Sequence, residues 1–298
     1  MKYDVIIIGG SYAGLSAAMS LGRAIRNVLV MDEGKPCNRQ TPYSHNFLTQ
    51  DGSTPAGIAA LGREQVLKYP TVTFQEGRAL EVKGEDGNFE VATAMGDRFY
   101  TGKLIFATGI KDVMPEIPGF SDCWGISVIH CPYCHGYEYK TQQTGILMNN
   151  DMAADFAGMI RNLTDKLTVF TNGAALISQE NQQLLGKMGV KIDEREIEEI
   201  LHNNGDISSL VFKDDTFRLD ALYARLPFEQ HCSIPKTLGC NFTDMGFIQV
   251  NDLQKTSVAG VFAAGDNVTP FRSVAAAVAA GNKAGAAINH ELVAAKVW

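Results

Sequence analysis

The 298-residue sequence has no excess of positive charge. Its 26 lysines and arginines are outnumbered by 33 aspartates and glutamates, which leaves a formal charge of −7. Sequence-independent binding to nucleic acid needs a clustered basic surface that displaces counterions from phosphates. We therefore expect no nucleic-acid partner.

Long apolar runs are also missing, since none approaches the ~20 residues that cross a bilayer. The chain passes from Met1–Asp4 directly into the strand-like run Val5–Ile8, without the anatomy of a signal peptide. We expect no membrane partner and a cytoplasmic location.

Closely spaced cysteines are few. Cys131 and Cys134 form one close pair, whereas Cys37, Cys123, Cys232 and Cys240 are scattered, so the chain lacks the disulfide framework of a small secreted protein. A lone Cys-x-x-Cys in a reducing compartment indicates redox chemistry or metal binding. The length and the ordinary composition, 45% hydrophobic and 20% charged, predict a globular chain with two domains.

Residues 3–32 predict a β-α-β unit of the dinucleotide-binding kind, with strands at 3–8 and 27–31 and a helix from 15 to about 26. In the turn between them, Gly9 permits a tight bend and Gly14 lets the helix pack close to the strand. The helix N-terminus presents N–H groups to a pyrophosphate, although Ser11 replaces the usual middle glycine. Asp32, after the second strand, is placed to accept hydrogen bonds from a ribose.

Two later segments strengthen this prediction. Leu104–Gly109 and Gly260–Asp266 are buried strands that end in small residues, and the second ends in a carboxylate. The three segments together resemble those that hold the pyrophosphate, the domain crossover and the ribityl chain of FAD in flavoprotein reductases with two dinucleotide domains. The alternative is three unrelated strand ends; we expect FAD.

The cysteine pair, in Cys131–Gly136, supports four interpretations. A zinc site lacks a second Cys-x-x-Cys or a paired histidine motif. The haem-attachment pattern Cys-x-x-Cys-His is matched literally, but it normally operates after export, for which there is no signal. A third interpretation, in which the pair consists of two reduced structural thiols, remains open. In the fourth interpretation the pair is a catalytic dithiol, in which one sulfur reacts with substrate and its neighbour resolves the mixed disulfide and relays electrons to the flavin.

His135 and Glu138 follow the pair. The imidazole has an ordinary pKa of ~6.5 and is placed to take or give the thiol proton, with Glu138 orienting it. The alternative is a solvated loop histidine. The expected catalytic residues are Cys131, Cys134, His135 and Glu138, and no metal is expected.

In order and spacing, these motifs over the whole chain resemble the low-molecular-weight thioredoxin reductase family. The histidine after the second cysteine, where thioredoxin reductases usually carry aspartate, is similar to the branch of small-molecule dithiol oxidases of the gliotoxin and holomycin pathways. The resemblance implies an α/β fold of two Rossmann-like, three-layer domains and usually a homodimer. It implies a discontinuous FAD domain, residues 1–113 and 242–298, with an inserted domain, residues 114–241, that carries the cysteines.

The resemblance also places His45 and Asn46 near the isoalloxazine ring, while N–H groups around Arg272 and Ser273 are expected to stabilise negative charge on the reduced flavin. Cys37 is expected near the adenosine end. The expected FAD-binding residues are Gly9, Gly10, Ser11, Tyr12, Ala13, Gly14, Asp32, Glu33, Asn38, Arg39, His45, Asn46, Thr108, Gly109, Gly265, Asp266, Arg272, Ser273 and Val274.

The inserted domain departs from the NADPH-using members of this family. After the strand 144–147, the turn Met148–Ala153 contains no glycine and adds Asp151. After the next strand, 167–170, residues Thr171–Gly173 stand where arginines would bind a 2′-phosphate. We therefore expect no conventional NADPH site.

Several functions remain open. The favoured one is dithiol oxidation, in which a substrate dithiol reduces the cysteine pair, the pair reduces FAD, and oxygen reoxidises the flavin. The reverse flow would have ferredoxin, another electron carrier or NADPH feed a thioredoxin reductase. A flavin-bound redox sensor is the non-enzymatic alternative. The partners expected are thioredoxin or a small-molecule dithiol or disulfide.

Overall fold

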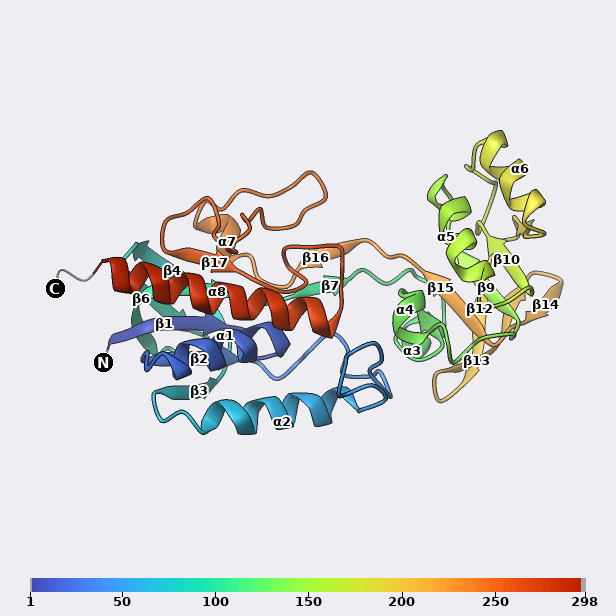
Figure 1. The fold of residues 1–298 in the computed structure, drawn as a ribbon. Coiled ribbons are helices and arrows are strands. Elements are labelled where there is room, and N and C mark those ends of the chain that lie inside the picture. Colours follow the sequence, from blue (N-terminus) through green and yellow to red (C-terminus); the bar gives the residue numbers. More distant parts are fainter. Residues whose placement is uncertain (1, 296–298) are drawn as a thin grey trace.

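The computed structural model describes residues 2–295 and contains two α/β domains joined by two extended strands (Figure 1). The first domain contains the two ends of the described chain, residues 2 and 295, and the inserted domain lies between its two sequence segments. The expected α/β class with two dinucleotide-binding-type domains is confirmed.

A seven-stranded sheet forms the centre of the first domain, in the order β3-β2-β1-β6-β5-β4, with β17 paired to the end of β6. Strands β3, β2, β1, β6 and β17 are parallel, whereas β4 and β5 form an antiparallel extension. The strands are β1 (Lys2–Ile8), β2 (Val28–Asp32), β3 (Val72–Glu76), β4 (Ala79–Glu85), β5 (Asn88–Thr93), β6 (Arg98–Phe106) and β17 (Val261–Ala263).

Both faces of this sheet are covered, which explains the continuous apolar run of β1. Val5 and Ile7 pack with helices α1 (Tyr12–Arg23), α2 (Pro55–Leu67) and α8 (Val274–Ala294). Ile6 and Ile8 pack on the other face, with β4, β5 and the segment that contains α7 (Ile234–Thr237). Within residues 2–295, no helix combines the length and the apolarity needed to cross a membrane.

Helices α1 and α8 pack at very close range. A Cβ atom added to Gly281 of α8 would lie 2.0 Å from the carbonyl oxygen of Ala13 in α1. Because a side chain does not fit at this distance, the small residues of α8 bring the two helices together and fix the N-terminus of α1 against the last segment of the chain.

The inserted domain contains a five-stranded parallel sheet in the order β11-β10-β9-β15-β8. Helices α5 and α6 cover one face, and a three-stranded antiparallel sheet with α3 covers the other. The elements are α3 (Phe120–Cys123), β8 (Val128–Ile129), α4 (Pro132–His135), β9 (Thr144–Leu147), α5 (Met152–Arg161), β10 (Leu167–Phe170), α6 (Gln179–Lys187), β11 (Lys191–Asp193), β12 (Glu199–Asn203), β13 (Asp206–Phe212), β14 (Asp215–Arg218) and β15 (Ala221–Ala224).

The two connections between the domains pair with each other. Strand β7 (Ile110–Asp112) forms an antiparallel ladder with β16 (Phe228–Gln230), and Val113 N–H donates to the carbonyl of Pro227 at 2.8 Å. After β16 the chain returns to the first domain, where Ile234 and Cys240 are buried in its core. We therefore propose that the inserted domain ends near residue 227, before the expected boundary at 241.

Replacing Gly281 with alanine tests the contact between α1 and α8. The added methyl group overpacks the helix pair, which costs about 1–3 kcal/mol and lowers the melting temperature by roughly 5 °C. Gly186 of α6 is the matched control, because a Cβ there meets no atom within 4 Å. Gly186→Ala is therefore expected to keep or slightly raise the melting temperature. Equal melting temperatures of the two variants would contradict this account.

Candidate active site

Three expected FAD-binding segments meet at the N-terminus of α1. Gly9 has a φ of 106°, and a Cβ on it would lie 2.2 Å from the carbonyl oxygen of Ala107, just before Thr108 and Gly109. A Cβ on Gly265 would lie 3.1 Å from the Cβ of Ala13. The next residues are held as well, because Asn267 Nδ2 donates to the carbonyl of Phe106 at 2.8 Å.

The start of α1 fits a bound pyrophosphate. Ser11 occupies the N-cap, and its side chain makes no capping hydrogen bond, so it does not compete for the N–H groups of the first turn. A Cβ on Gly14 would lie 1.9 Å from the carbonyl oxygen of Gly9, which shows how tightly the turn is folded. Gly10, Tyr12 and Ala13 complete the turn, and a Cβ on Gly10 would lie 2.9 Å from the Cβ of Asp32.

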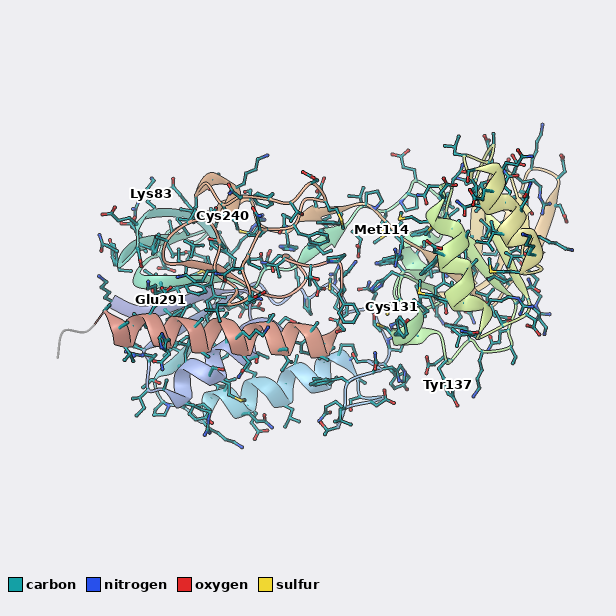
Figure 2. All side chains as sticks on the ribbon, turned by 45° about the horizontal axis from the view of Figure 1, so that its top comes forward. Lys83, Met114, Cys131, Tyr137, Cys240 and Glu291 are labelled. Atoms are coloured by element: carbon teal, nitrogen blue, oxygen red, sulfur yellow. The ribbon has the colours of Figure 1, made fainter. Side chains whose placement is uncertain are left out.

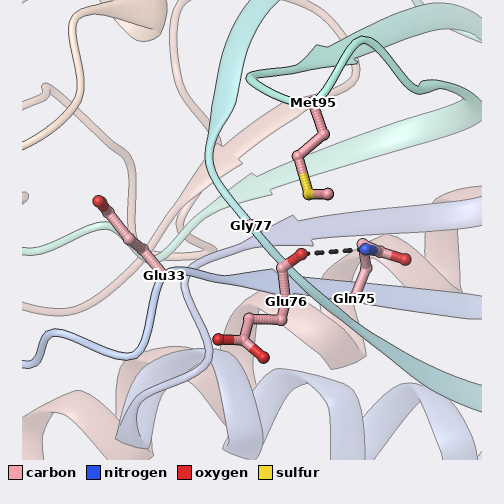
Figure 3. A pocket seen from close by; sticks show the side chains of 5 residues that line it. All are labelled: Glu33, Gln75, Glu76, Gly77 and Met95. Carbon is pink, nitrogen blue, oxygen red and sulfur yellow. Dashed lines mark hydrogen bonds between the residues drawn. The ribbon is translucent and has the colours of Figure 1, made fainter.

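Asp32 lies beside this turn at the end of β2. Its Oδ2 accepts the N–H of Gly10 at 2.5 Å and its Oδ1 accepts that of Gly34 at 2.7 Å. Its expected hydrogen bond to a ribose stays a prediction. The adjacent Glu33 lines a shallow hollow, shown in Figure 3, at the ends of β2 and β3; the other lining residues are Gln75, Glu76, Gly77 and Met95.

The segment after Glu33 approaches the site at two points. Asn38 Nδ2 donates to the hydroxyl of Tyr12 at 3.3 Å, and Cys37 Sγ lies 3.9 Å from Oδ2 of Asp266. Arg39 donates to the carbonyl of Pro36. The roles of Asn38 and Arg39 in binding FAD, and the place of Cys37 near the adenosine end, stay predictions. Cys37 is exposed, yet packing around its sulfur and the Asp266 carboxylate raise the pKa of this thiol to about 11.

Arg272 joins three parts of the site. It donates from Nη1 and Nη2 to the two carboxylate oxygens of Asp112, at 2.8 and 3.1 Å, and its Nε lies 3.6 Å from Oδ2 of Asp266. Burial raises the pKa of the Asp266 carboxyl, and Arg272 opposes this shift. Ser273 is the N-cap of α8 and accepts the N–H of Ala276 at 3.1 Å, so Ser273 and Val274 lie at the helix start as expected.

The cysteine pair lies on the single-turn helix α4, for which Cys131 is the N-cap and Pro132 the first residue. The carbonyl of Cys131 accepts the N–H groups of Cys134 and His135, at 3.2 and 3.3 Å. Both thiols are free and partly buried, and Figure 2 shows Cys131 on the side of the inserted domain that faces the first domain. The positive charge of Arg272 in the first domain favours the thiolate form of both cysteines, in agreement with this placement.

The two thiols differ in acidity. A hydrogen bond from the Cys134 thiol lowers the pKa of Cys131 to about 7, and the Cys131 thiolate in turn raises the pKa of Cys134. The pair therefore holds one proton near neutral pH, with the negative charge on Cys131. Asp266 contributes to raising the pKa of Cys134.

Beside the pair, His135 and Glu138 meet His45 of the first domain. The rings of His45 and His135 are perpendicular, with centroids 6.2 Å apart, and His45 Nε2 lies 3.6 Å from Oε1 of Glu138. Burial, followed by the nearby His45, lowers the pKa of His135. At neutral pH His135 is therefore an uncharged base next to the dithiol. Asn46, expected near the flavin with His45, has a left-handed backbone and donates its N–H to Asp51.

Sequence reasoning missed three residues of this region. Asp112 is the ion-pair partner of Arg272, and Asp51 lies 3.6 Å from Nδ1 of His45. His130, directly before Cys131, packs against Trp124, and burial together with Arg272 lowers its pKa to about 3. Only His130 had a signal in the sequence, namely its position next to the pair. Across residues 2–295, no three histidine, cysteine or carboxylate side chains gather to hold a metal ion.

The turn between β9 and α5 is tied to the loop after β10. Asn149 donates to the carbonyl of Ala174 at 3.0 Å and accepts the N–H of Leu176 at 2.6 Å. Asp151 accepts the N–H of Ser178 at 2.7 Å. The polar side chains at the N-terminus of α5 thus hydrogen-bond to the backbone of residues 174–178.

Comparisons with known proteins agree with this geometry. The family model described as pyridine nucleotide-disulphide oxidoreductase matches residues 3–281. A protein named thioredoxin reductase tcpT, from Claviceps purpurea, is 33% identical, over 98% of this chain and 94% of its own. The crystal structure of an oxidoreductase from Agrobacterium tumefaciens is 39% identical, with a TM-score of 0.93, and covers 99% of this chain and 100% of its own.

The crystal structure of HlmI is 30% identical, with a TM-score of 0.92, and covers 98% of this chain and 93% of its own. Together these matches confirm the expected FAD, the expected enzyme class and the expected resemblance to thioredoxin reductases.

The acidity of Cys131 is testable by replacing its partner. In the reduced protein, we expect alkylation of Cys131 by iodoacetamide to rise with pH around a midpoint near 7. Cys134→Ala removes the hydrogen-bond donor and moves the midpoint up toward the ~8.5 of a free thiol, so the rate at pH 7 falls by roughly tenfold. Cys134→Ser keeps a donor and is expected to keep the midpoint near that of the parent. Mass spectrometry of the modified peptide measures both, and identical profiles for the two variants would contradict the assignment.

Proposed function

The chain belongs to the pyridine nucleotide-disulphide oxidoreductase family, and within this family we propose that it is a dithiol oxidase that passes electrons to oxygen rather than an NADPH-fed reductase. It is a thioredoxin reductase-like FAD oxidoreductase. Bound FAD would accept two electrons and one proton from the cysteine pair. The turn from Gly9 to Gly14, Thr108–Gly109 and Gly265–Asp266 would hold it.

The observation that carries this proposal is the β9–α5 turn. A pyrophosphate at a helix N-terminus needs free backbone N–H groups and a turn that lets phosphate approach. Here Asn149 and Asp151 tie the turn to residues 174–178, and the Asp151 carboxylate adds charge that repels phosphate. The loop Thr171–Gly173 offers no arginine for a 2′-phosphate, in contrast to what NADPH binding requires.

The acidity of Cys131 suits the exchange by which a substrate dithiol would be oxidised. A substrate thiolate attacks the Cys131 sulfur of the oxidised pair, breaking the Cys131–Cys134 bond and forming a mixed disulfide with Cys131. The second substrate thiol then attacks the substrate sulfur, forms the product disulfide and releases Cys131 as a thiolate. A sulfur of low pKa leaves fast, which suits Cys131 for this role.

The neutral His135 supplies the base for the substrate thiol. The overall reaction is the oxidation of one dithiol to one disulfide by one oxygen molecule, which is reduced to hydrogen peroxide. The two electrons pass through the cysteine pair and FAD, so atoms and charge balance without a nicotinamide.

The substrate we propose is a small-molecule dithiol, in line with the resemblance to the gliotoxin and holomycin branch. Tyr133 and Tyr137, each 67% exposed, place two aromatic rings on and beside α4 that suit an apolar metabolite. Thioredoxin is the competing substrate. A homodimer and a cytoplasmic location remain predictions.

Two anaerobic reductions of the flavin-loaded protein test this function. We expect dithiothreitol to bleach the flavin band near ~450 nm and excess NADPH to leave it nearly unchanged, because only the first supplies electrons through the cysteines. Rapid bleaching by NADPH would overturn the proposal and indicate an ordinary thioredoxin reductase.

Admission of air to the dithiol-reduced protein tests the acceptor. The flavin band is expected to return within seconds, with one hydrogen peroxide formed per product disulfide. If the flavin stays reduced in air and is reoxidised only by an electron-carrier protein, oxygen is not the acceptor and the oxidase assignment is wrong. Cys134→Ala is the control that should block reduction by the dithiol.

A further inference from the structure

A closed loop of the first domain presents His45 to the cysteine helix. The ends of the loop are joined by the bridge between Ser44 and Ser53, with Ser44 N–H donating to Ser53 at 2.8 Å and Gly52 N–H donating to Ser44 at 2.9 Å. Inside the loop, Asp51 accepts the N–H of Asn46 at 2.7 Å, so this carboxylate is fixed to the backbone next to His45. The loop thus sets the direction of the imidazole.

The two ring nitrogens of His45 face two carboxylates from different domains. Nδ1 lies 3.6 Å from Asp51 of the same loop, and Nε2 lies 3.6 Å from Glu138, beyond α4 in the inserted domain. Glu138 also raises the pKa of His135, in opposition to burial, so its carboxylate lies near both imidazoles. The titratable groups that face His45 are therefore Asp51, Glu138 and His135.

We propose that His45 is a positioning residue for proton transfer. The thiol proton passes from His135 to Glu138, and then through His45 toward Asp51 and solvent. The path ends at its most exposed member, since the side chains of Glu138, His45 and Asp51 are 39%, 21% and 69% exposed. This inference rests on the proposed dithiol chemistry and holds for either direction of electron flow.

The proton balance requires such an exit. When a substrate dithiol reduces the oxidised pair, its two S–H bonds and the Cys131–Cys134 bond break and the substrate S–S bond forms. Because the reduced pair keeps one proton, on Cys134, the other substrate proton must leave, while the kept proton and two electrons would pass on to FAD. His135 is an uncharged base that accepts the leaving proton, and the relay restores His135 for the next cycle.

The test is the rate of anaerobic flavin reduction by dithiothreitol, followed by stopped flow from pH 6 to 9 in His45→Gln. We expect a loss of about tenfold near neutral pH, because a relay step is removed, and recovery toward the parent rate at high pH, where solvent takes the proton. Asp51→Asn is expected to lose less of the rate of flavin reduction, with the same dependence of that loss on pH. A pH-indicator dye measures whether proton release lags behind flavin bleaching in the variants, as the relay requires.

His202→Gln is the matched control. His202 pairs with Asp122 at 3.7 Å and is 24% exposed, close to the values for His45, but it lies on β12. Its replacement is expected to keep the rate within twofold at every pH. Added imidazole should restore the rate of His45→Gly at neutral pH.

A purely structural role for His45 would give a loss that is equal at all pH values and is not rescued by imidazole. That result, or a rate of flavin reduction in His45→Gln equal to that of the parent, overturns the relay and does not affect the proposal of a dithiol oxidase. Alkylation of Cys131 in reduced His45→Gln is expected to match the parent, which shows that the pair is intact. If dithiothreitol fails to bleach the parent protein, the proposed function and the relay both fall.

Discussion

The bidentate ion pair between Arg272 and Asp112 is the interaction on which the rest of the site depends. Both side chains are largely buried, at 16% and 5% exposure, so the charges are costly unless their geometry is good. Two parallel hydrogen bonds from the guanidinium provide that geometry. The pair joins β7, the first connection between the domains, to the start of α8.

The same guanidinium acts on the groups around it. It lies 3.6 Å from Asp266, whose burial alone favours a neutral carboxyl, and its charge favours the thiolate form of both redox cysteines. One positive charge therefore links the domain connection, an expected FAD-binding residue and the cysteine pair. A change that moved Arg272 would alter all three at once.

Local patterns predicted the fold elements well where burial alone decides them. Strands β9 and β10 have the expected bounds, 144–147 and 167–170, because each is a short apolar run between turns. Helix α1 was predicted to continue to about residue 26, but it ends at Arg23 because Ile25 adopts a left-handed backbone, with a φ of 57°. Nothing in the side chain of this exposed, β-branched residue predicts that conformation.

The site residues also differ in how far local sequence predicts them. The glycine turn, the cysteine pair and His135 carry their chemistry in local spacing, and the sequence therefore placed them. Asp112 and Asp51 gain their roles from partners that only the fold supplies: Arg272 lies 160 positions from Asp112, and Glu138 reaches His45 from another domain. A carboxylate in a polar stretch carries no sign of such a partner.

The thiol chemistry of the pair does not by itself set the direction of electron flow. The low pKa that makes Cys131 a good leaving group in dithiol oxidation also keeps it ionised as the attacking thiolate in disulfide reduction. Microscopic reversibility requires His135 to serve both directions, as an acceptor of the proton in one and a donor in the other. Direction then depends on which redox partner reaches the flavin. Among the residues discussed, Asn149 and Asp151 are the ones that bear on that question, since they bind the loop that a nicotinamide dinucleotide would need.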